Sequence, residues 1–455
     1  MPGLFGIFGM SSVALQSFQN AMQTVGHNIA NAGTEGFHRQ RVELAQGNPE
    51  FTAWGALGTG VRPDSIRRVQ DRFLESALQR ELPMLARFEV QADALSQAEI
   101  TFGEPSDGGL TSQLDDFFAG FDDLASNPGD SGSREAVVRR GVALAQALGS
   151  ARERLYAQQQ EITAQIGYSL DQGNRLLREV QSLNRDILAS QRGGVVPADL
   201  EDRRDQLIEQ LGDMIGATGS VEGDGTATIR MGGRALVQLE AATEIEYDLT
   251  KLNGAPKVGD RELLANELDG RVGGLFEARD EHLASAIRKL DEFAAGLAAR
   301  VNELHSTGVD QNGDDAVPFF VFVGLEGNSV DRAAAGLRVN PLITADPSLV
   351  AAGRDGSDGD NTLALDLAAL RNDSSGPTGA LRSLIVDFGS RARQATDLAD
   401  GQRVVVDSFR AQRESVSGVS LDEEGADLLR YQRSYQAAAQ MIATADEMLQ
   451  TLLAL

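Results

Sequence analysis

The first 34 residues of the chain contain no Asp, Glu, Lys or Arg, although they are rich in Gln, Asn, Ser and Thr. Apolar residues recur in this stretch at alternating spacings of three and four, which predicts a helix with a heptad seam. We expect Ser11 or Ser12 to cap its start and Gly33 to end it. Because surface helices normally carry charges on their outer face, we expect this helix to be enclosed on several sides.

The C-terminal stretch repeats the pattern of the N-terminal one. One row of apolar residues recurs every seven positions from Leu421 to Leu449, and a second row recurs at the same interval from Tyr431 to Leu452. Ser420 is the expected N-cap, and Glu423 would complete a capping box. The pattern predicts a long helix that continues to the C-terminus.

Both seams are too apolar for a solitary helix, because each fully buried Leu, Ile or Phe gains about 1.5–3 kcal/mol. One interpretation is an intramolecular coiled coil between the first and last helices. The other is that this pair also packs against further copies or partners, and the uncharged outer faces favour it. The predicted assembly interface consists of Leu15, Phe18, Met22, Val25, Asn28, Ile29, Asn31, Leu421, Leu428, Tyr431, Tyr435, Ile442, Leu449 and Leu452.

Long helical patterns fill most of the chain between its ends. The most extended runs from Ser133 to Ser190 without a proline, which predicts a helix typical of elongated bundles. Further helices are expected over residues 71–100 (interrupted or kinked near Pro83), 110–126, 200–215, 263–305, 363–370 and 384–416. Short extended segments are expected over residues 36–70, a hairpin with a Gly232-Gly233 turn over 221–249, and strands at 319–323 and 337–339.

The predicted fold is mainly α with a small β module: an elongated rod of long helices whose N- and C-terminal segments pair at one end. Residues 1–70 with 417–455 would form a terminal axial coiled-coil core. Residues 71–216 with 262–309 and 363–416 would form a helical bundle domain. Residues 217–261 with 310–362 would form a small, β-rich outer domain.

Composition and motifs exclude several classes of function. The net charge is −26, which disfavours nucleic acid and anionic membrane surfaces as partners. The chain has no Cys and no uninterrupted apolar run long enough for a membrane span, so we expect no thiolate metal site and no membrane insertion. The apolar start lacks a cationic region and a cleavage site, so no cleaved signal peptide is expected. Four isolated His residues show no metal-ligand spacing, and we predict no catalytic residues, metal or cofactor.

Four segments resemble blocks of the FlgK family, flagellar hook-associated proteins of type 1. Related terminal blocks occur more broadly in rod and hook proteins, whereas the two internal blocks narrow the resemblance to FlgK. The segments are Asn28–Asn31 followed by Gly36–Gln40, Leu200–Leu207, Asp310–Phe320, and Ser417–Glu424 followed by Tyr431, Gln432 and Tyr435.

The resemblance implies a structural subunit of the bacterial flagellum that joins the hook to the filament, and no enzyme. Such proteins are secreted through the flagellar type III export route and self-associate into a ring at the hook–filament junction. The implied partners are the hook protein, the second junction protein (hook-associated protein type 3) and a cytoplasmic export chaperone at the C-terminal region. Terminal segments of this family are disordered before assembly, so their ordering depends on contacts with partners.

One departure from the family concerns the region after Phe320. Longer members carry an additional outer β domain there, whereas only about 40 residues separate Phe320 from the helical pattern at Leu363 in this chain. We expect that this outermost domain is missing or vestigial.

Three alternatives remain open from the sequence. One is another axial subunit, a hook or rod protein, and the long Ser133–Ser190 helix and the Asp202–Leu207 block argue against it. The second is a cell-envelope hydrolase, and no catalytic constellation that would support it is recognised. A soluble intracellular coiled-coil scaffold is the third alternative, and recovery of the protein in sheared external filaments would eliminate it.

Overall fold

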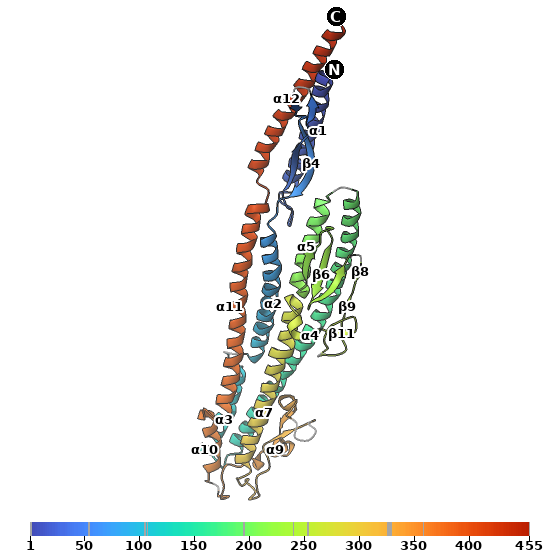
Figure 1. The fold of residues 1–455 in the computed structure, drawn as a ribbon. Helices are drawn as coiled ribbons and strands as arrows, with labels where there is room; N and C mark the ends of the chain where they lie inside the picture. The colour runs from blue at the N-terminus through green and yellow to red at the C-terminus, as the bar shows by residue number, and fades with distance from the viewer. Residues whose placement is uncertain are drawn as a thin grey trace.

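The computed structural model describes residues 2–52, 55–103, 106, 108–193, 196–239, 241–252, 254–324, 330–357 and 359–454. The molecule is an elongated rod of long helices, and both ends of the chain lie at the same end of the rod (Figure 1). The predicted fold class, mainly helical with small β elements and paired terminal segments, is confirmed. We call residues 1–70 and 417–455 the terminal core, and residues 71–416 the helical domain.

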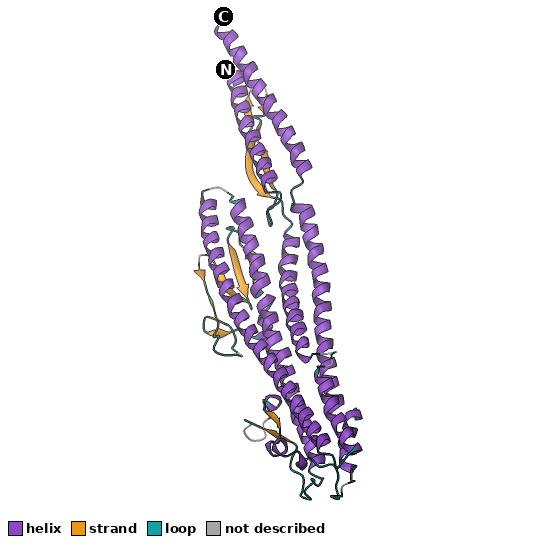
Figure 2. Cartoon of the chain, turned by 180° about the vertical axis from the view of Figure 1, so that it is seen from behind, coloured by secondary structure: helices purple, strands orange, loops and turns teal. Residues whose placement is uncertain are grey.

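In the described part of the helical domain, the helices of eight or more residues run along the rod (Figure 2). They are α2 (Arg72–Phe102), α3 (Leu110–Ser126), α4 (Ser131–Arg192), α5 (Ala198–Ile215), α6 (Gly270–Glu277), α7 (Ala284–His305), α10 (Thr362–Ala369) and α11 (Pro377–Ser417). Shorter helical turns connect them: η1 (Ala265–Glu267), η2 (Ala278–Leu283), α8 (Ala333–Gly336), α9 (Pro341–Ala345), η3 (Pro347–Leu349) and η4 (Leu370–Asn372).

Helix α4 is continuous for 62 residues, as its proline-free pattern predicts. The Asp130 side chain caps its start by accepting a hydrogen bond from the Ser133 backbone N–H at 2.8 Å. A helix-internal glycine costs about 1 kcal/mol relative to alanine. Gly173 is nevertheless accommodated because a Cβ there would lie 2.9 Å from Cγ2 of Ile215, so the glycine allows α5 to pack closely.

In the helical domain, the course of α2 and the start of α6 differ from expectation. Helix α2 continues through Pro83, whose ring is buried near Gly212 of α5, so the predicted interruption is wrong. The helix expected from Leu263 begins only at Gly270, which has a φ of +64°. Preceding residues instead form the strand Arg261–Glu262 and a short 3₁₀ turn, because a left-handed residue does not continue a regular helix.

Small antiparallel sheets are attached to the helical domain. The first contains β5 (Thr218–Val221), β6 (Ala227–Met231), β7 (Arg234–Gln238) and β8 (Ala241–Ala242), in that order. The predicted Gly232-Gly233 turn joins β6 to β7, with φ of +55° and +75°. A second sheet contains β9 (Ile245–Glu246), β10 (Lys257–Val258) and β11 (Arg261–Glu262), and a third pairs β12 (Phe320–Phe322) with β13 (Leu337–Val339).

These sheets do not form the single outer β domain that the sequence led us to expect. Strands β5–β9 pack beside α4 and α5, whereas β12 and β13 pack on α4 and α7 nearer the opposite end of the rod (Figure 1). We therefore propose two separate β attachments in place of one domain. Between β12 and α10, the described residues form only short helices and strands. Residues 325–329 lie outside the described part.

The terminal core pairs the two ends of the chain. It contains α1 (Pro2–Asn31), β1 (Gln40–Gln46), β2 (Glu50–Thr52), β3 (Gly55–Leu57), β4 (Val61–Arg68) and α12 (Leu421–Leu453). Helix α1 lies against α12, and β1 pairs with β4 beside them. The expected start of α1 at Ser11 or Ser12 is wrong, because the helix begins at Pro2 and Ser11 is buried inside it.

Buried apolar residues divide the molecule. One large cluster extends through the helical domain, and a small one joins α2 to α11 through Leu78, Leu82, Leu85 and Val406. Among the residues that the structure describes, neither cluster contains a member of the terminal core. The described part of the chain also has no helix with the length and apolar character needed to cross a bilayer.

Candidate assembly interface and interdomain joint

The predicted seam lies between α1 and α12, which run side by side (Figures 1 and 2). Val25 is buried on α1, and Ala438 and Ala445 are buried on α12. Most other predicted seam residues are half-buried within the single subunit. These are Leu15, Phe18, Met22, Leu428, Tyr431, Tyr435, Ile442 and Leu449.

Some predicted interface residues lie outside the intramolecular contact. Ile29 is 37% exposed, because the last turn of α1 directs Asn28, and not Ile29, toward β1 and α12. Leu421, the first residue of α12, is 59% exposed. Asn31 makes a local hydrogen bond from Nδ2 to the His27 carbonyl at 3.0 Å. Leu452 belongs to α12, but its side chain lies outside the described part.

Both terminal helices also expose large apolar side chains that their pairing does not cover. These are Phe5 and Val13 on α1, and Leu429, Met441, Met448 and Leu453 on α12. Large apolar side chains that stay exposed along a helix pair are available for burial against another protein. The pair therefore has the composition of an incomplete bundle.

Asn28 is the polar centre of the terminal core. Its Nδ2 donates to the Gln40 carbonyl at 2.9 Å and to Oε2 of Glu424 at 3.0 Å, while its Oδ1 accepts from the Gln40 backbone N–H at 2.9 Å. Glu424 is almost completely buried, and its Oε1 lies 2.6 Å from Nε of Arg39. One asparagine thus joins α1, β1 and α12, and its amide and the Arg39 guanidinium compensate the buried carboxylate.

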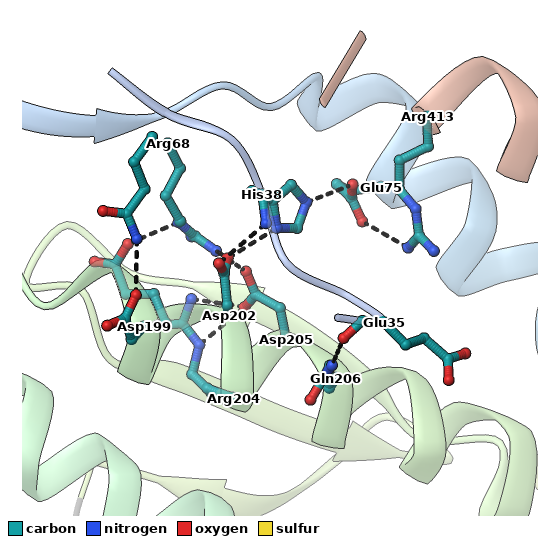
Figure 3. Close-up of polar contacts among 12 residues, drawn as sticks. Glu35, His38, Arg68, Glu75, Asp199, Asp202, Arg204, Asp205, Gln206 and Arg413 are labelled. Atoms are coloured by element: carbon teal, nitrogen blue, oxygen red, sulfur yellow. Dashed lines mark hydrogen bonds and ion pairs between the residues drawn. The ribbon is translucent and has the colours of Figure 1, made fainter. Parts of the chain in front are cut away.

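A cluster of charged side chains lies where the terminal core meets the helical domain (Figure 3). Asp202 of α5 is its centre: Oδ1 lies 2.8 Å from Nδ1 of His38 and accepts from Nη1 of Arg68 at 2.7 Å. Its Oδ2 accepts from the His38 backbone N–H at 3.1 Å. All three side chains are less than a tenth exposed, so these charges interact in a partly desolvated environment.

Further ion pairs extend this cluster on the helical side. Arg68 Nη1 donates to Oδ2 of Asp205 at 2.7 Å, and the other Asp205 oxygen accepts from Nη2 of Arg204 at 2.7 Å. Arg204 is completely buried and also donates to the Gly225 carbonyl in the β5–β6 turn. The chain of contacts therefore connects the terminal core to α5 and to its attached sheet.

His38 also faces α2. Its Nε2 lies 3.2 Å from Oε1 of Glu75, which in turn lies near the guanidinium of Arg413 on α11. Burial by itself would lower the pKa of His38, but hydrogen bonds and charges from Asp202 and Glu75 outweigh it and raise the pKa to about 9. His38 is therefore a cation at neutral pH, held between two carboxylates.

Two outer contacts border this cluster. Asp199 Oδ1 accepts from Nε2 of Gln40 at 2.7 Å and lies 3.1 Å from Nε2 of His27. The Gln206 side chain donates to the Glu35 carbonyl. The next residue, Gly36, has a φ of +74°, a conformation that would be strained for a residue with a side chain. His27 is thus a polar interface residue, as its place on the first helix suggests.

The residues of this cluster are not among those to which the sequence alone assigned a role. His38 and Asp202 belong to segments singled out as family blocks, but Arg68, Glu75 and Arg413 belong to none. One sequence pattern points to this cluster. Asp199, Asp202 and Asp205 recur every three residues on α5, which places carboxylates on one helix face. Their partners are far away in sequence, so that pattern alone does not identify them.

The arrangement offers little for chemistry. Within the described residues there is no group of three or more His, Cys, Asp or Glu side chains placed to hold a metal ion. Asp310, the first residue of the Asp310–Phe320 block, accepts hydrogen bonds at Oδ1 from the backbone N–H groups of Asn312 and Asp314. That loop is a turn closed by its own backbone.

Comparisons with known proteins agree with this geometry. The model of the flagellar hook-associated protein FlgK helical domain matches residues 95–320, and that of the flagellar basal body rod FlgEFG protein C-terminal region matches residues 410–455. Flagellar hook-associated protein 1 of Bacillus subtilis is 29% identical, over 96% of this chain and 95% of that protein. The protein of the same name from Escherichia coli is 25% identical, over 96% of this chain and 97% of that protein.

A solved structure supports the fold. The flagellar hook junction protein FlgK from Burkholderia pseudomallei superposes with a TM-score of 0.65 at 15% identity, covering 75% of this chain and all of that one. The alignment with the Escherichia coli relative extends over 534 positions, although this chain has 455 residues, so that relative contains segments that this chain lacks. The paired terminal helices, the long-helix domain and these matches together show that this chain belongs to the FlgK family of flagellar hook-associated proteins.

Proposed function

We propose that this protein is a structural subunit of the bacterial flagellum, located at the junction between hook and filament. The observation that carries the proposal is the pair α1–α12, which ends the rod with large apolar side chains still exposed on both helices. Burial of these side chains against further subunits would be favourable, because it removes apolar surface from water. Membership of the FlgK family identifies those subunits as axial components of the flagellum.

The finer parts of the proposal concern its partners. We infer self-association into a ring, with the hook protein on one side and the second junction protein on the other. An export chaperone would hold the C-terminal region before secretion, which would protect the exposed face of α12 from non-specific association. The role is mechanical, and the proposal involves no catalytic step.

Gene deletion tests this function. Cells without the protein should retain hooks, lack filaments and release flagellin into the medium, as seen by electron microscopy and by immunoblotting of the supernatant. Complementation with the wild-type gene should restore filaments. Normal filaments on deleted cells would refute the proposal. Lytic activity of the purified protein on cell-wall substrate would instead favour the hydrolase alternative.

The seam itself is tested by a double substitution, Leu428→Asp with Tyr435→Asp. We expect a folded helical domain that is not incorporated at the junction, because two carboxylates would have to be buried between terminal helices. The matched control is Leu342→Asp with Leu365→Asp, which alters two apolar residues that are at least half exposed in the helical domain. If motile flagella assemble with the first pair of substitutions, the seam assignment is wrong.

A further inference from the structure

The contact between the terminal core and the helical domain is polar, whereas apolar side chains pack within each of these two parts. Two short connections of the chain cross it, residues 69–71 and 418–420. Backbone hydrogen bonds hold them together: the Val69 N–H donates to the Arg39 carbonyl at 2.8 Å, and the Arg39 N–H donates to the Ser417 carbonyl at 3.0 Å. Neither hydrophobic cluster of the described residues extends across this boundary. The relative orientation of the two parts is therefore determined by polar side chains.

These side chains converge on one carboxylate. Asp202 accepts from the backbone and the imidazole of His38 and from the guanidinium of Arg68. His38 precedes β1 and Arg68 ends β4, and the two strands pair there, with Gln40 opposite Arg68. Asp202 thus holds both strands of the terminal sheet at the same end (Figure 3).

Asp202 is itself fixed to the helical domain. The next turns of α5 bury Leu207, Ile208 and Leu211 in the large hydrophobic cluster. Because α5 cannot rotate without disrupting this packing, the position of the Asp202 carboxylate is set by the helical domain. Two contacts to neighbouring strands from one fixed point restrict the tilt of the sheet, whereas a single contact would leave it free to pivot.

From this geometry we propose that Asp202, with His38 and Arg68, is a positioning residue that sets the angle between the terminal core and the helical domain. This role rests on the proposed function in one respect: the terminal core must have the correct orientation to pack with axial neighbours. When the three-way contact is lost, Arg68 keeps its contacts with Glu201 and Asp205 and His38 keeps its contact with Glu75. Fewer contacts then fix the terminal core, and it pivots more freely about residues 69–71 and 418–420. Such hinge motion about a few connecting residues is a recognised type of conformational change.

The test measures the interdomain distance directly in the full-length chain. Because the protein has no Cys, spin labels can be attached at introduced cysteines alone. Gln436→Cys on α12 and Ala189→Cys on α4, both exposed, report across the joint by double electron–electron resonance. We expect Asp202→Asn to broaden this distance distribution roughly twofold, because more orientations become populated. Asp202→Glu, which keeps the charge, should restore a narrower distribution.

Two controls separate positioning from general stability. Labels at Ala189→Cys and Arg393→Cys both report within the helical domain, and their distance distribution should be unchanged by Asp202→Asn. Glu179→Gln removes an exposed ion pair between α4 and Arg203 of α5, the helix that also carries Asp202, and should leave both distributions unchanged. Arg68→Gln is the second joint variant, to be used if Asp202→Asn does not fold, and it should broaden the same distance.

Three outcomes would overturn the inference. One is a wild-type distribution as broad as that of Asp202→Asn, which is the result expected if the terminal segments are disordered before assembly, as the family resemblance implies, and not paired as in the structure. Another is equal broadening for both label pairs, which would indicate loss of folding in place of loss of orientation. The third is an unchanged interdomain distance in both joint variants. Each result is obtained with purified protein, so it is independent of whether deletion and complementation support the junction role.

Discussion

Helices α4 and α12 follow the same apolar rhythm but differ in how much of it they bury. Leu170 and Leu177 of α4 are each 1% exposed, whereas Leu428 and Tyr435 of α12 are only half-buried and Leu421 is 59% exposed. Helix α4 is surrounded by α3, α5, α6 and α7, while α12 packs on α1. Periodicity therefore specifies a helix and its apolar face, but the number of neighbours determines whether that face is satisfied within one chain.

The largest test of this difference compares equivalent truncations. Leu170→Ala should reduce the free energy of unfolding of the helical domain by about 2–5 kcal/mol, because it leaves a cavity in a packed core. Leu428→Ala in isolated protein should cost less than about 1 kcal/mol, since the side chain is already partly hydrated. Urea unfolding followed by circular dichroism measures both. Equal losses would mean that the terminal pair is as completely packed as the bundle.

A second test uses His305, which lies in the helical domain. Its Nδ1 donates to the Val317 carbonyl at 2.8 Å, and its Nε2 accepts from the Ala351 N–H at 3.1 Å. Burial lowers the pKa of His305 to about 4. The unfolded chain therefore binds this proton more tightly, and stability should fall by up to about 3 kcal/mol as pH drops from 6.5 to about 4. Unfolding of wild type and His305→Gln across this range should show a shallower slope in the variant.

His38 at the joint should show the opposite pH dependence. Its raised pKa, about 9, means that its contribution is fully present below pH 6.5 and is lost as pH rises through about 9. The charged groups that face it are Asp202, Glu75, Arg68 and Arg413. We expect a loss of about 1–3 kcal/mol in wild type that His38→Gln does not show. A common alkaline slope in both proteins would contradict the assignment.

The smallest expected effect concerns Asn28. Asn28→Ala leaves the buried Gln40 N–H and Glu424 without their amide partner, which should cost about 1–2 kcal/mol. Amide hydrogen exchange should be faster in α1 and β1, with no change in α4. Gln19→Ala, an exposed substitution on the same helix, is the matched control. Identical exchange in both variants would remove Asn28 from the centre of the terminal core.

Much of the fold could be predicted because the helical pattern is local. The ends of α3 agree with its apolar stripe and with the Asn127-Pro128-Gly129 turn, and α4 agrees with its proline-free stretch. The predicted start of α1 was wrong because the helix extends upstream of Ser11, whose buried hydroxyl has no hydrogen-bond partner among the described residues and therefore caps nothing. Local preferences therefore identify helices more reliably than they identify where a helix begins.

The candidate sites divide in the same way. The sequence alone places Val25 on the apolar face of the first helix and Leu428 and Tyr435 on that of the last, because a heptad sets the face regardless of the rest of the chain, while their role in assembly stays a prediction. The joint was not predictable, because Asp202 meets His38 across 164 positions and Arg68 across 134. Any of 67 acidic residues is an equal candidate for such a pairing until the path of the chain is known.

The sequence by itself determined that this chain forms long helices and that its two ends carry matching apolar faces. Both properties depend on the spacing of neighbouring residues. The tertiary structure alone decided which charged residues meet at the joint and how much of each terminal face remains uncovered. Those outcomes depend on the packing of distant segments, since burial and ion pairing are properties of position in space and not of position along the chain.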